Sequence, residues 1–281
     1  MSQLSSADRG RIERPGPARR QRGRRVPMNA RPRLRVGCAG WSIGTPQRDL
    51  FDEGASMLAR YATRFDAVEV NTSFHRAHRR ATWQRWAASV PAHFRFAAKL
   101  PRSISHESGL RGAGPALDGF LAEAGGLGRK LGALLLQLPP ALAFDARSAG
   151  AFFGMLRRRT DLPLACEPRH ASWFEPRADE LLQRHAVTRV AADPARLPAA
   201  AQPLHNGTGW TYWRWHGSPR MYYSRYDDDA LQALADAVAA VRGRRAWVIF
   251  DNTAHGHAVT DALRLKALSG RLKDTGGGRH A

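Results

Sequence analysis

Eight short β-type runs alternate with longer helical patterns, and this alternation constrains the fold more than any other feature of the sequence. The β-type runs are residues 34–38, 67–70, 95–99, 133–137, 164–167, 189–192, 210–215 and 246–250. Helical patterns fall between them, near residues 53–64, 81–89, 115–130, 146–158, 176–185, 228–241 and 255–268. The segment 194–209 contains three prolines, which predicts a long loop.

Eight β–α repeats in about 248 residues fit a single (β/α)8 TIM-like barrel in both count and length. A doubly wound open sheet is the alternative, and it requires a glycine-rich phosphate-binding turn after its first strand. The turn here, GCAGW at residues 37–41, lacks the third glycine of that fingerprint. We therefore predict an α/β barrel domain over residues 34–270, followed by a flexible tail at 271–281.

The formal net charge of +20 is unevenly distributed along the chain. Residues 1–33 contain ten arginines against Asp8 and Glu13, which places +8 there and leaves +12 on the remaining residues. This segment has no hydrophobic periodicity and no apolar core of a secretory signal, so we predict a disordered basic N-terminal arm. Positive charge attracts polyanions without sequence specificity, and the arm therefore leaves a nucleic-acid partner open.

Composition limits the cellular setting. No run of about 18 apolar residues occurs, so the sequence predicts no membrane-spanning helix and no membrane partner. Cys38 and Cys166 are too few for a disulfide framework or a four-thiolate zinc site. A reducing compartment follows, and we expect a cytoplasmic protein.

Polar residues end seven of the eight predicted strands, at the edge where barrel enzymes build their active sites. Barrel strands are covered by helices outside and by side chains inside, so a charged residue at a strand end requires a reason. Side chains alternate along a strand, which places Glu69 and Asn71 on one face and sets Asp193 opposite Val190 and Ala192. The strand-end residues are Glu69, Asn71, Lys99, Gln137, Glu167, Asp193, Arg214, His216, Asp251 and Asn252. Together they predict a polar pocket at the C-terminal rim.

Two glutamates are the strongest catalytic candidates. Strands two and five face each other across a barrel, which brings the carboxylates of Glu69 and Glu167 to within roughly 5–6 Å. That separation suits acid–base catalysis, or a divalent cation such as Mg²⁺ or Mn²⁺ with Asp193 and His216 assisting. The alternative is a buried ion pair, with Lys99, Arg169 or Arg214, that closes the barrel mouth.

Other rim residues suit substrate binding. Lys99, Arg169 and Arg214 would bind an anion, and His106 would carry protons. A Schiff base at Lys99 is disfavoured, because neighbouring carboxylates would keep its amine protonated. Aromatic rings would stack on a sugar or base, and amides would supply neutral hydrogen bonds. The remaining candidates are Trp41, Asn71, Phe74, Gln137, His170, Trp173, Tyr226, Asp251 and Asn252.

Several short segments carry a combined pattern, in order, across residues 34–268. They are GCAGWS at 37–42, VEVNTSF at 68–74, FAAK at 96–99 with His106, LLQLPP at 135–140, EPRH at 167–170 with Trp173, Arg214 with His216-Gly217, and FDN at 250–252. In this combination the chain resembles the YecE-like family, also called the domain of unknown function 72 family. The resemblance implies a TIM-like barrel and leaves the activity undefined. One departure is His75, where the family usually has tyrosine, so the resemblance assigns no phenol to that position.

Three functions remain open. The first is an enzyme, a hydrolase or isomerase, that acts on a small anionic or sugar-like molecule in the rim pocket. The second is a nucleic-acid-binding protein or a nuclease related to endonuclease-type barrels, which would use the basic arm and the rim arginines. The third is a barrel that binds a ligand without transforming it.

Overall fold

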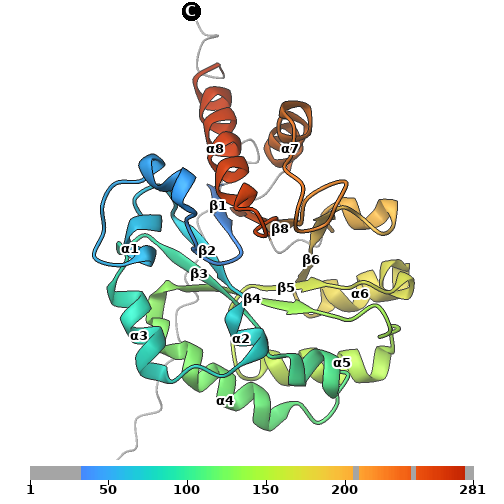
Figure 1. The fold of residues 1–281 in the computed structure, drawn as a ribbon. Coiled ribbons are helices and arrows are strands. Elements are labelled where there is room, and N and C mark those ends of the chain that lie inside the picture. Colours follow the sequence, from blue (N-terminus) through green and yellow to red (C-terminus); the bar gives the residue numbers. More distant parts are fainter. Residues whose placement is uncertain (1–32, 205–208, 242–244, 276–281) are drawn as a thin grey trace, which may run out of the picture.

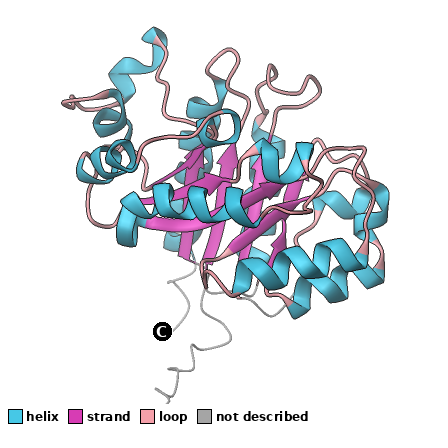
Figure 2. Ribbon diagram, turned by 90° about the horizontal axis from the view of Figure 1, so that it is seen from below, coloured by secondary structure: helices cyan, strands magenta, loops and turns pink. Residues whose placement is uncertain are grey.

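Parallel strands form two sheets at the centre of the structure, and helices lie around them (Figures 1 and 2). The computed structural model describes residues 33–204, 209–241 and 245–275. One sheet has the order β2-β3-β4-β5-β6, the other the order β1-β9-β8-β7, and every pairing is parallel. In these ranges the strands are β1 (Arg33–Cys38), β2 (Ala67–Val70), β3 (Arg95–Lys99), β4 (Leu131–Gln137), β5 (Leu164–Glu167), β6 (Val187–Arg189), β7 (Ala191–Asp193), β8 (Trp210–Trp215) and β9 (Arg245–Phe250). The predicted α/β class with parallel strands is therefore confirmed.

Helices follow most strands where the sequence predicts them. The α-helices are α1 (Met57–Tyr61), α2 (Thr72–His75), α3 (Arg80–Ala88), α4 (Gly114–Ala124), α5 (Ala146–Arg157), α6 (Pro176–Arg184), α7 (Asp228–Ala240) and α8 (His257–Thr275). Helices α7 and α8 lie beside the sheet that contains β1 and β9, and α3 to α6 lie beside the other (Figure 1). Asp145 caps α5 and Asp227 caps α7, because each carboxylate accepts a backbone N–H of the first turn at 2.8 Å.

The sixth predicted strand is divided. Residues 189–192 were expected to form one strand, but the chain forms β6 and β7, which are separated by Val190. The backbone N–H of Val190 still donates to the Cys166 carbonyl of β5 at 2.8 Å, while β7 pairs with β8 in the other sheet. The chain therefore passes from one sheet to the other at this residue.

The two sheets also approach each other at β1 and β2. Ala39 and Glu69 form a parallel bridge, and the N–H of Gly40 donates to the Glu69 carbonyl at 2.9 Å. The Tyr61 hydroxyl accepts a bond from the Cys38 N–H at 2.8 Å and donates to the Ala67 carbonyl at 3.0 Å. A buried side chain of α1 therefore links the backbones of the two edge strands.

A distinct apolar cluster lies between the sheets. It draws small residues from β2 to β5 and large aromatic ones from β8 and β9, and its members are Ala67, Ala97, Ala133, Leu135, Ala165, Val190, Trp210, Tyr212, Trp247 and Ile249. Their neighbours along the strands, such as Val68, Leu134 and Trp213, belong to the larger core beneath the helices. The strand alternation therefore assigns each side chain to an inner or an outer layer.

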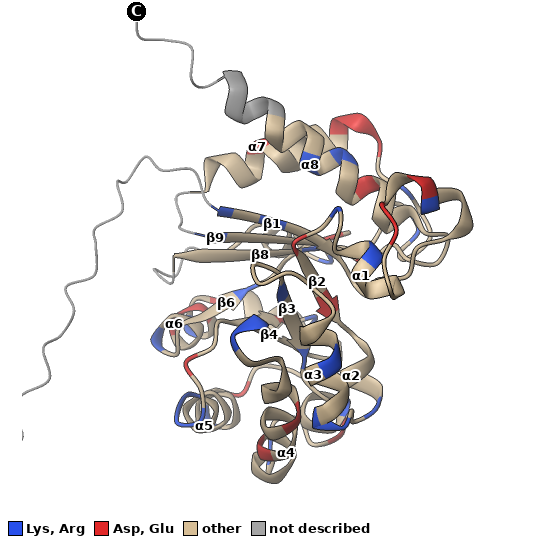
Figure 3. Cartoon of the chain, turned by 90° about the vertical axis from the view of Figure 1, so that its left-hand side faces the viewer, with Lys and Arg blue, Asp and Glu red and all other residues tan. Residues whose placement is uncertain are grey.

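The predicted boundaries differ in part from those observed. Helix α8 continues to Thr275, so the tail expected from residue 271 is helical over its first residues. The predicted basic arm, except Arg33, lies outside the described residues, as do 205–208 of the predicted loop and 276–281 of the tail. The described part of the loop contains a short 3-10 helix, Pro198–Ala201. Lys and Arg lie on α1, α3, α5 and α8, so positive charge is spread over the outer helices (Figure 3). No described helix is long and apolar enough to cross a membrane.

Candidate functional site at the C-terminal rim

A buried guanidinium occupies the centre of the rim. Arg214, near the end of β8, donates to Glu69 at 2.8 and 3.1 Å, to Glu167 at 2.5 Å and to Asp251 at 2.9 Å. The side chains of Arg214 and Glu69 have no exposed surface. Tyr212 completes the arrangement by donating its hydroxyl to Glu69 at 2.8 Å. The two glutamates meet as the strand geometry predicts, but both bind the same arginine.

His216 joins two of these carboxylates. Its Nδ1 lies 3.0 Å from Asp251 Oδ2, and its Nε2 lies 3.0 Å from Glu167 Oε1. Although burial opposes the charged form, Glu167 raises the pKa of His216 above its ordinary value. Burial likewise opposes ionisation of the two acids, but Arg214 and His216 hold the pKa of Glu167 and of Asp251 below the ordinary values. His216 is therefore held between two carboxylates that favour its cation.

An amide separates this ionic network from a lysine. Gln137 Nε2 donates to Glu167 Oε2 at 3.0 Å, and Lys99 Nζ donates to Gln137 Oε1 at 2.8 Å. Lys99 Nζ also lies 4.2 Å from the centre of the Phe74 ring. His106 packs edge-on against the same ring, with ring centres 4.9 Å apart. Lys99, Phe74 and His106 thus form one group beside the ion pairs of Arg214.

Arg169 forms the other margin of the rim. Its Nη2 lies 3.4 Å from Glu167 Oε1, and its side chain is 18% exposed. Although burial opposes the charged form, Glu167 and a side-chain hydrogen bond with Tyr222 raise the pKa of the Arg169 guanidinium. A cavity beside Arg169 is lined by Glu167, His216, Met221 and residues of the loop after β7.

The rim network thus consists of Glu69, Lys99, Gln137, Glu167, Arg169, Arg214, His216 and Asp251. The sequence predicted each of these residues from its position at or just after a strand end. The sequence analysis missed Tyr212 because it considered only strand ends, and Tyr212 lies inside its strand. Strand alternation could have found it, since Tyr212 lies on the same face as Arg214.

Several predicted residues lie outside the network. Asp193 accepts a bond from the Tyr226 hydroxyl at 2.8 Å, and its strand position opposite Val190 and Ala192 explains why it points away from Arg214. Asn252 donates to Asp261 at 2.8 Å and has no exposed surface. His170 caps a short helix by accepting the Ser172 N–H at 3.2 Å.

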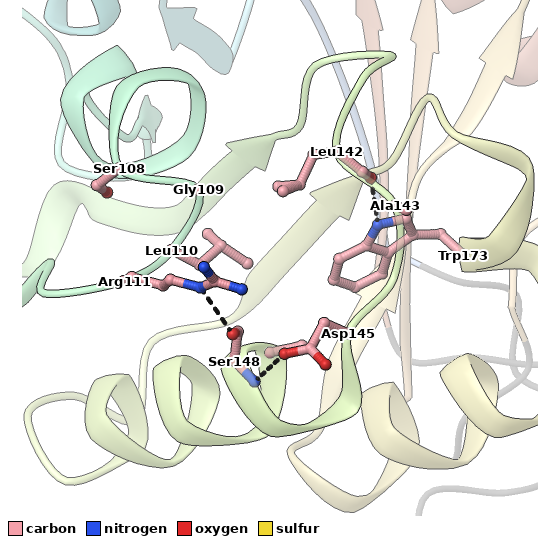
Figure 4. Close-up of a pocket in the computed structure, with 10 residues that line it drawn as sticks. Ser108, Gly109, Leu110, Arg111, Leu142, Ala143, Asp145, Ser148 and Trp173 are labelled. Atoms are coloured by element: carbon pink, nitrogen blue, oxygen red, sulfur yellow. Dashed lines mark hydrogen bonds between the residues drawn. The ribbon is translucent and has the colours of Figure 1, made fainter.

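The predicted aromatic residues do not form one platform. Trp41 packs against Trp86, with ring centres 5.1 Å apart. Trp173 is buried and donates its indole N–H to the Leu142 carbonyl at 3.0 Å, in a separate pocket that Arg111 also lines (Figure 4). Of the predicted stacking residues, Phe74 contacts a member of the rim network, Lys99. Asn71 lies at the end of β2, and its buried Oδ1 has no hydrogen-bond partner among the described residues.

The described residues of the rim offer no set of ligands for a divalent cation. Within the described ranges, no group of three or more His, Cys, Asp or Glu side chains is arranged so that it could hold a metal ion. The Arg214 guanidinium explains this result, because it binds the three carboxylates that a cation would need. The residues present therefore do not fit the Mg²⁺ or Mn²⁺ site that the sequence left open.

The fold and the rim define an α/β protein whose parallel strands carry a buried ionic network at their C-terminal ends. A family model described as "Protein of unknown function DUF72" matches residues 35–277, and the chain belongs to this family. The UPF0759 protein YecE of Escherichia coli K12 is 29% identical over 153 residues, which cover 52% of this chain and 56% of that protein. The chain thus aligns with little more than half the length of that relative.

Two solved structures have the same fold. A DUF72 family protein of Thermotoga maritima MSB8 is 23% identical, with a TM-score of 0.71 over 84% of this chain and 98% of that chain. One of Enterococcus faecalis V583 is 22% identical, with a TM-score of 0.71 over 84% of this chain and 95% of that chain. These names assign a family and a fold, and none of them states an activity.

Proposed function

We propose that the protein is an enzyme that binds a small anionic substrate at the rim, between Lys99 and Arg169. The observation that carries the proposal is that the carboxylates of the rim network have strong cationic partners, whereas Lys99 and Arg169 do not have equally strong anionic ones. Each carboxylate is held by Arg214, whereas Lys99 donates one hydrogen bond, to a neutral amide, among the described residues. Arg169 makes a long contact to Glu167 and a side-chain hydrogen bond with Tyr222. The donors that remain for a ligand are therefore cationic.

The charge balance of the rim network favours the same ligand. Three carboxylates, Glu69, Glu167 and Asp251, stand against Arg214, Lys99 and Arg169, so these side chains balance when His216 is neutral. Protonation of His216, which the raised pKa favours, adds one positive charge that a bound anion would neutralise. Paired hydrogen bonds from arginine and lysine are the usual means of binding carboxylate or phosphate groups.

The remaining residues would have different roles. Glu69 and Arg214 lack exposed surface and would act as positioning residues for Glu167 and Asp251. Both ring nitrogens of His216 face carboxylates, so His216 would exchange protons with Glu167 or Asp251 and reach the substrate only through them. We therefore assign Glu69 a positioning role in place of the predicted role as an acid or base that touches substrate.

Anion binding is tested by thermal unfolding in phosphate, oxalate and chloride at matched ionic strength. We expect phosphate or oxalate to raise the melting temperature of the wild type above the chloride value. Arg169→Gln and Lys99→Gln should lose this increment. Arg85→Gln, at an exposed arginine of α3, should retain it. An equal increment in all four proteins would mean non-specific charge screening and would overturn the proposal.

We also propose that the two sheets are halves of one closed (β/α)8 barrel. The Ala39–Glu69 bridge, the Tyr61 hydroxyl link and the passage through Val190 support closure at both junctions. The apolar cluster shared by β2 to β5 and by β8 and β9 supports a common interior. An experimental structure with a continuous gap between β1 and β2 would contradict closure.

Binding without turnover is an outcome of the same experiments: an anion would stabilise the protein, yet no compound would be transformed. The nucleic-acid function would use the rim arginines together with residues 1–33, which lie almost entirely outside the described residues. It stays a prediction.

A further inference from the structure

We propose that Lys99 is the nucleophile of this site, and that its amine condenses with the carbonyl carbon of a substrate that also carries an anionic group. This inference rests on the proposed function, because it requires that the rim bind such a molecule. Lys99 stands at the end of β3, on the inner face that it shares with Ala97. A lysine at a strand end in a largely buried site is well placed for covalent catalysis.

The immediate partners of the Lys99 amine are uncharged. Nζ donates to Gln137 Oε1 at 2.8 Å and lies over the Phe74 ring at 4.2 Å. The orientation of Gln137 is fixed, because its Nε2 donates to Glu167. The amide therefore separates Lys99 from the nearest carboxylate, whereas Arg214 binds three carboxylates directly. This contrast indicates that the protein stabilises a permanent cation at Arg214, whereas no described carboxylate pairs directly with Lys99.

Burial and the nearby Arg214 lower the pKa of Lys99 to about 8, although Glu69, Glu167 and Asp251 act in the opposite direction. Most of the amine is still protonated at neutral pH, as the carboxylates lead one to expect, but its neutral fraction exceeds that of an ordinary lysine.

A proton carrier lies beside the amine. Ser105 Oγ lies 2.8 Å from His106 Nδ1, and the His106 ring packs against Phe74, which Lys99 also contacts. Burial, followed by Lys99 and the nearby arginines, lowers the pKa of His106, which favours the neutral imidazole. Its Nε2 would exchange protons with an intermediate bound to Lys99.

The condensation balances as follows. The lone pair of neutral Lys99 Nζ forms a bond to the carbonyl carbon, and the C=O π pair moves to oxygen, which takes up a proton. A proton transfers from nitrogen through His106, a second protonation of the oxygen releases water, and a protonated imine remains. One carbonyl compound, one amine and one proton thus give one iminium ion and one water. Arg169 would bind the anionic group, so the substrate class is a carbonyl acid such as a 2-oxo acid.

Borohydride trapping tests the proposal. The full-length protein is incubated with pyruvate and sodium borohydride at pH 7.5, and the reduced adduct is located by peptide mass mapping. The chain contains four lysines, Lys99, Lys130, Lys266 and Lys273, so the other three serve as internal controls. We expect Lys99 to be labelled roughly 200-fold faster than a lysine with an ordinary pKa, because the neutral fractions at pH 7.5 differ by about that factor.

Two variants make the test specific. Gln137→Glu places a carboxylate against Lys99, and it should shift the pH dependence of labelling to higher pH. Lys99→Arg should remove the adduct while retaining the positive charge, and circular dichroism checks that both variants fold. Label spread evenly over the lysines, or unchanged labelling in Lys99→Arg, would overturn the inference. Stabilisation by oxalate without any labelling would overturn the Schiff base alone, whereas loss of both would overturn the proposed function as well.

Discussion

Replacing Glu69 by Gln tests whether the centre of the rim holds the fold together. The carboxylate accepts two hydrogen bonds from Arg214, at 2.8 and 3.1 Å, and one from Tyr212 at 2.8 Å. An amide there presents an N–H₂ group to at least one of these donors and removes the charge opposite a fully buried guanidinium. Breaking one partner of a buried ion pair typically costs about 3–5 kcal/mol. In a domain of this size that corresponds to a melting temperature lower by roughly 6–20 °C.

Urea unfolding followed by tryptophan fluorescence measures the effect on the free energy of unfolding. The control is Asp118→Asn, which breaks the Asp118–Arg159 pair on the outer helices, where the Asp118 side chain is 56% exposed. This control should unfold close to the wild-type midpoint. The double variant Glu69→Leu/Arg214→Met should lose more stability than Glu69→Gln, because it also leaves Glu167 and Asp251 without their arginine partner. Wild-type stability in Glu69→Gln would refute a structural role for the pair.

Four further outcomes are expected. Tyr61→Phe should lower the free energy of unfolding by about 1–3 kcal/mol, because buried backbone groups lose a partner, and an unchanged urea midpoint would contradict the bridging role. The pKa of His216 is raised in the folded state, so its contribution to stability is present at low pH and is lost as the pH rises through that pKa. The difference in free energy of unfolding between wild type and His216→Gln should therefore be larger at low pH and shrink as the pH rises. Cys38 and Cys166 should react with a thiol reagent only on unfolding, because burial raises the pKa of both thiols, that of Cys38 to about 12. Rapid labelling of the native protein would refute their burial. Deleting residues 1–33 should lower affinity for duplex DNA and flatten its salt dependence, and unchanged binding would remove the arm from that function.

Strand alternation accounts for most of what the sequence could predict. The period of two placed Glu69, Glu167 and Arg214 on one inner face, and these residues meet in the structure. The same rule grouped Asp193 with the glutamates, because its alternating neighbours Val190 and Ala192 are apolar. Val190 instead belongs to the inner cluster, and Asp193 bonds to Tyr226 outside the rim network. The division of the sixth strand left no trace in the residue pattern, because it depends on which sheet each residue pairs with.

The sequence did not allow us to predict contacts between residues that lie far apart in the chain. The pairing of Lys99 with Gln137 rather than with a carboxylate depends on the lateral order of β3, β4 and β5 and on rotamers. The link made by Tyr61 depends on where α1 packs against β1 and β2. Both arise from tertiary packing, which local patterns do not encode.

A crystal structure of the protein with bound oxalate tests the anion site most directly. We predict density for oxalate within hydrogen-bond distance of Lys99 Nζ and of the Arg169 guanidinium, with Arg214 still bound to its three carboxylates. Oxalate bound only at surface arginines, or in the pocket at the start of α8 that Gly40 and His255 line, would contradict the proposal that these two cations select the substrate.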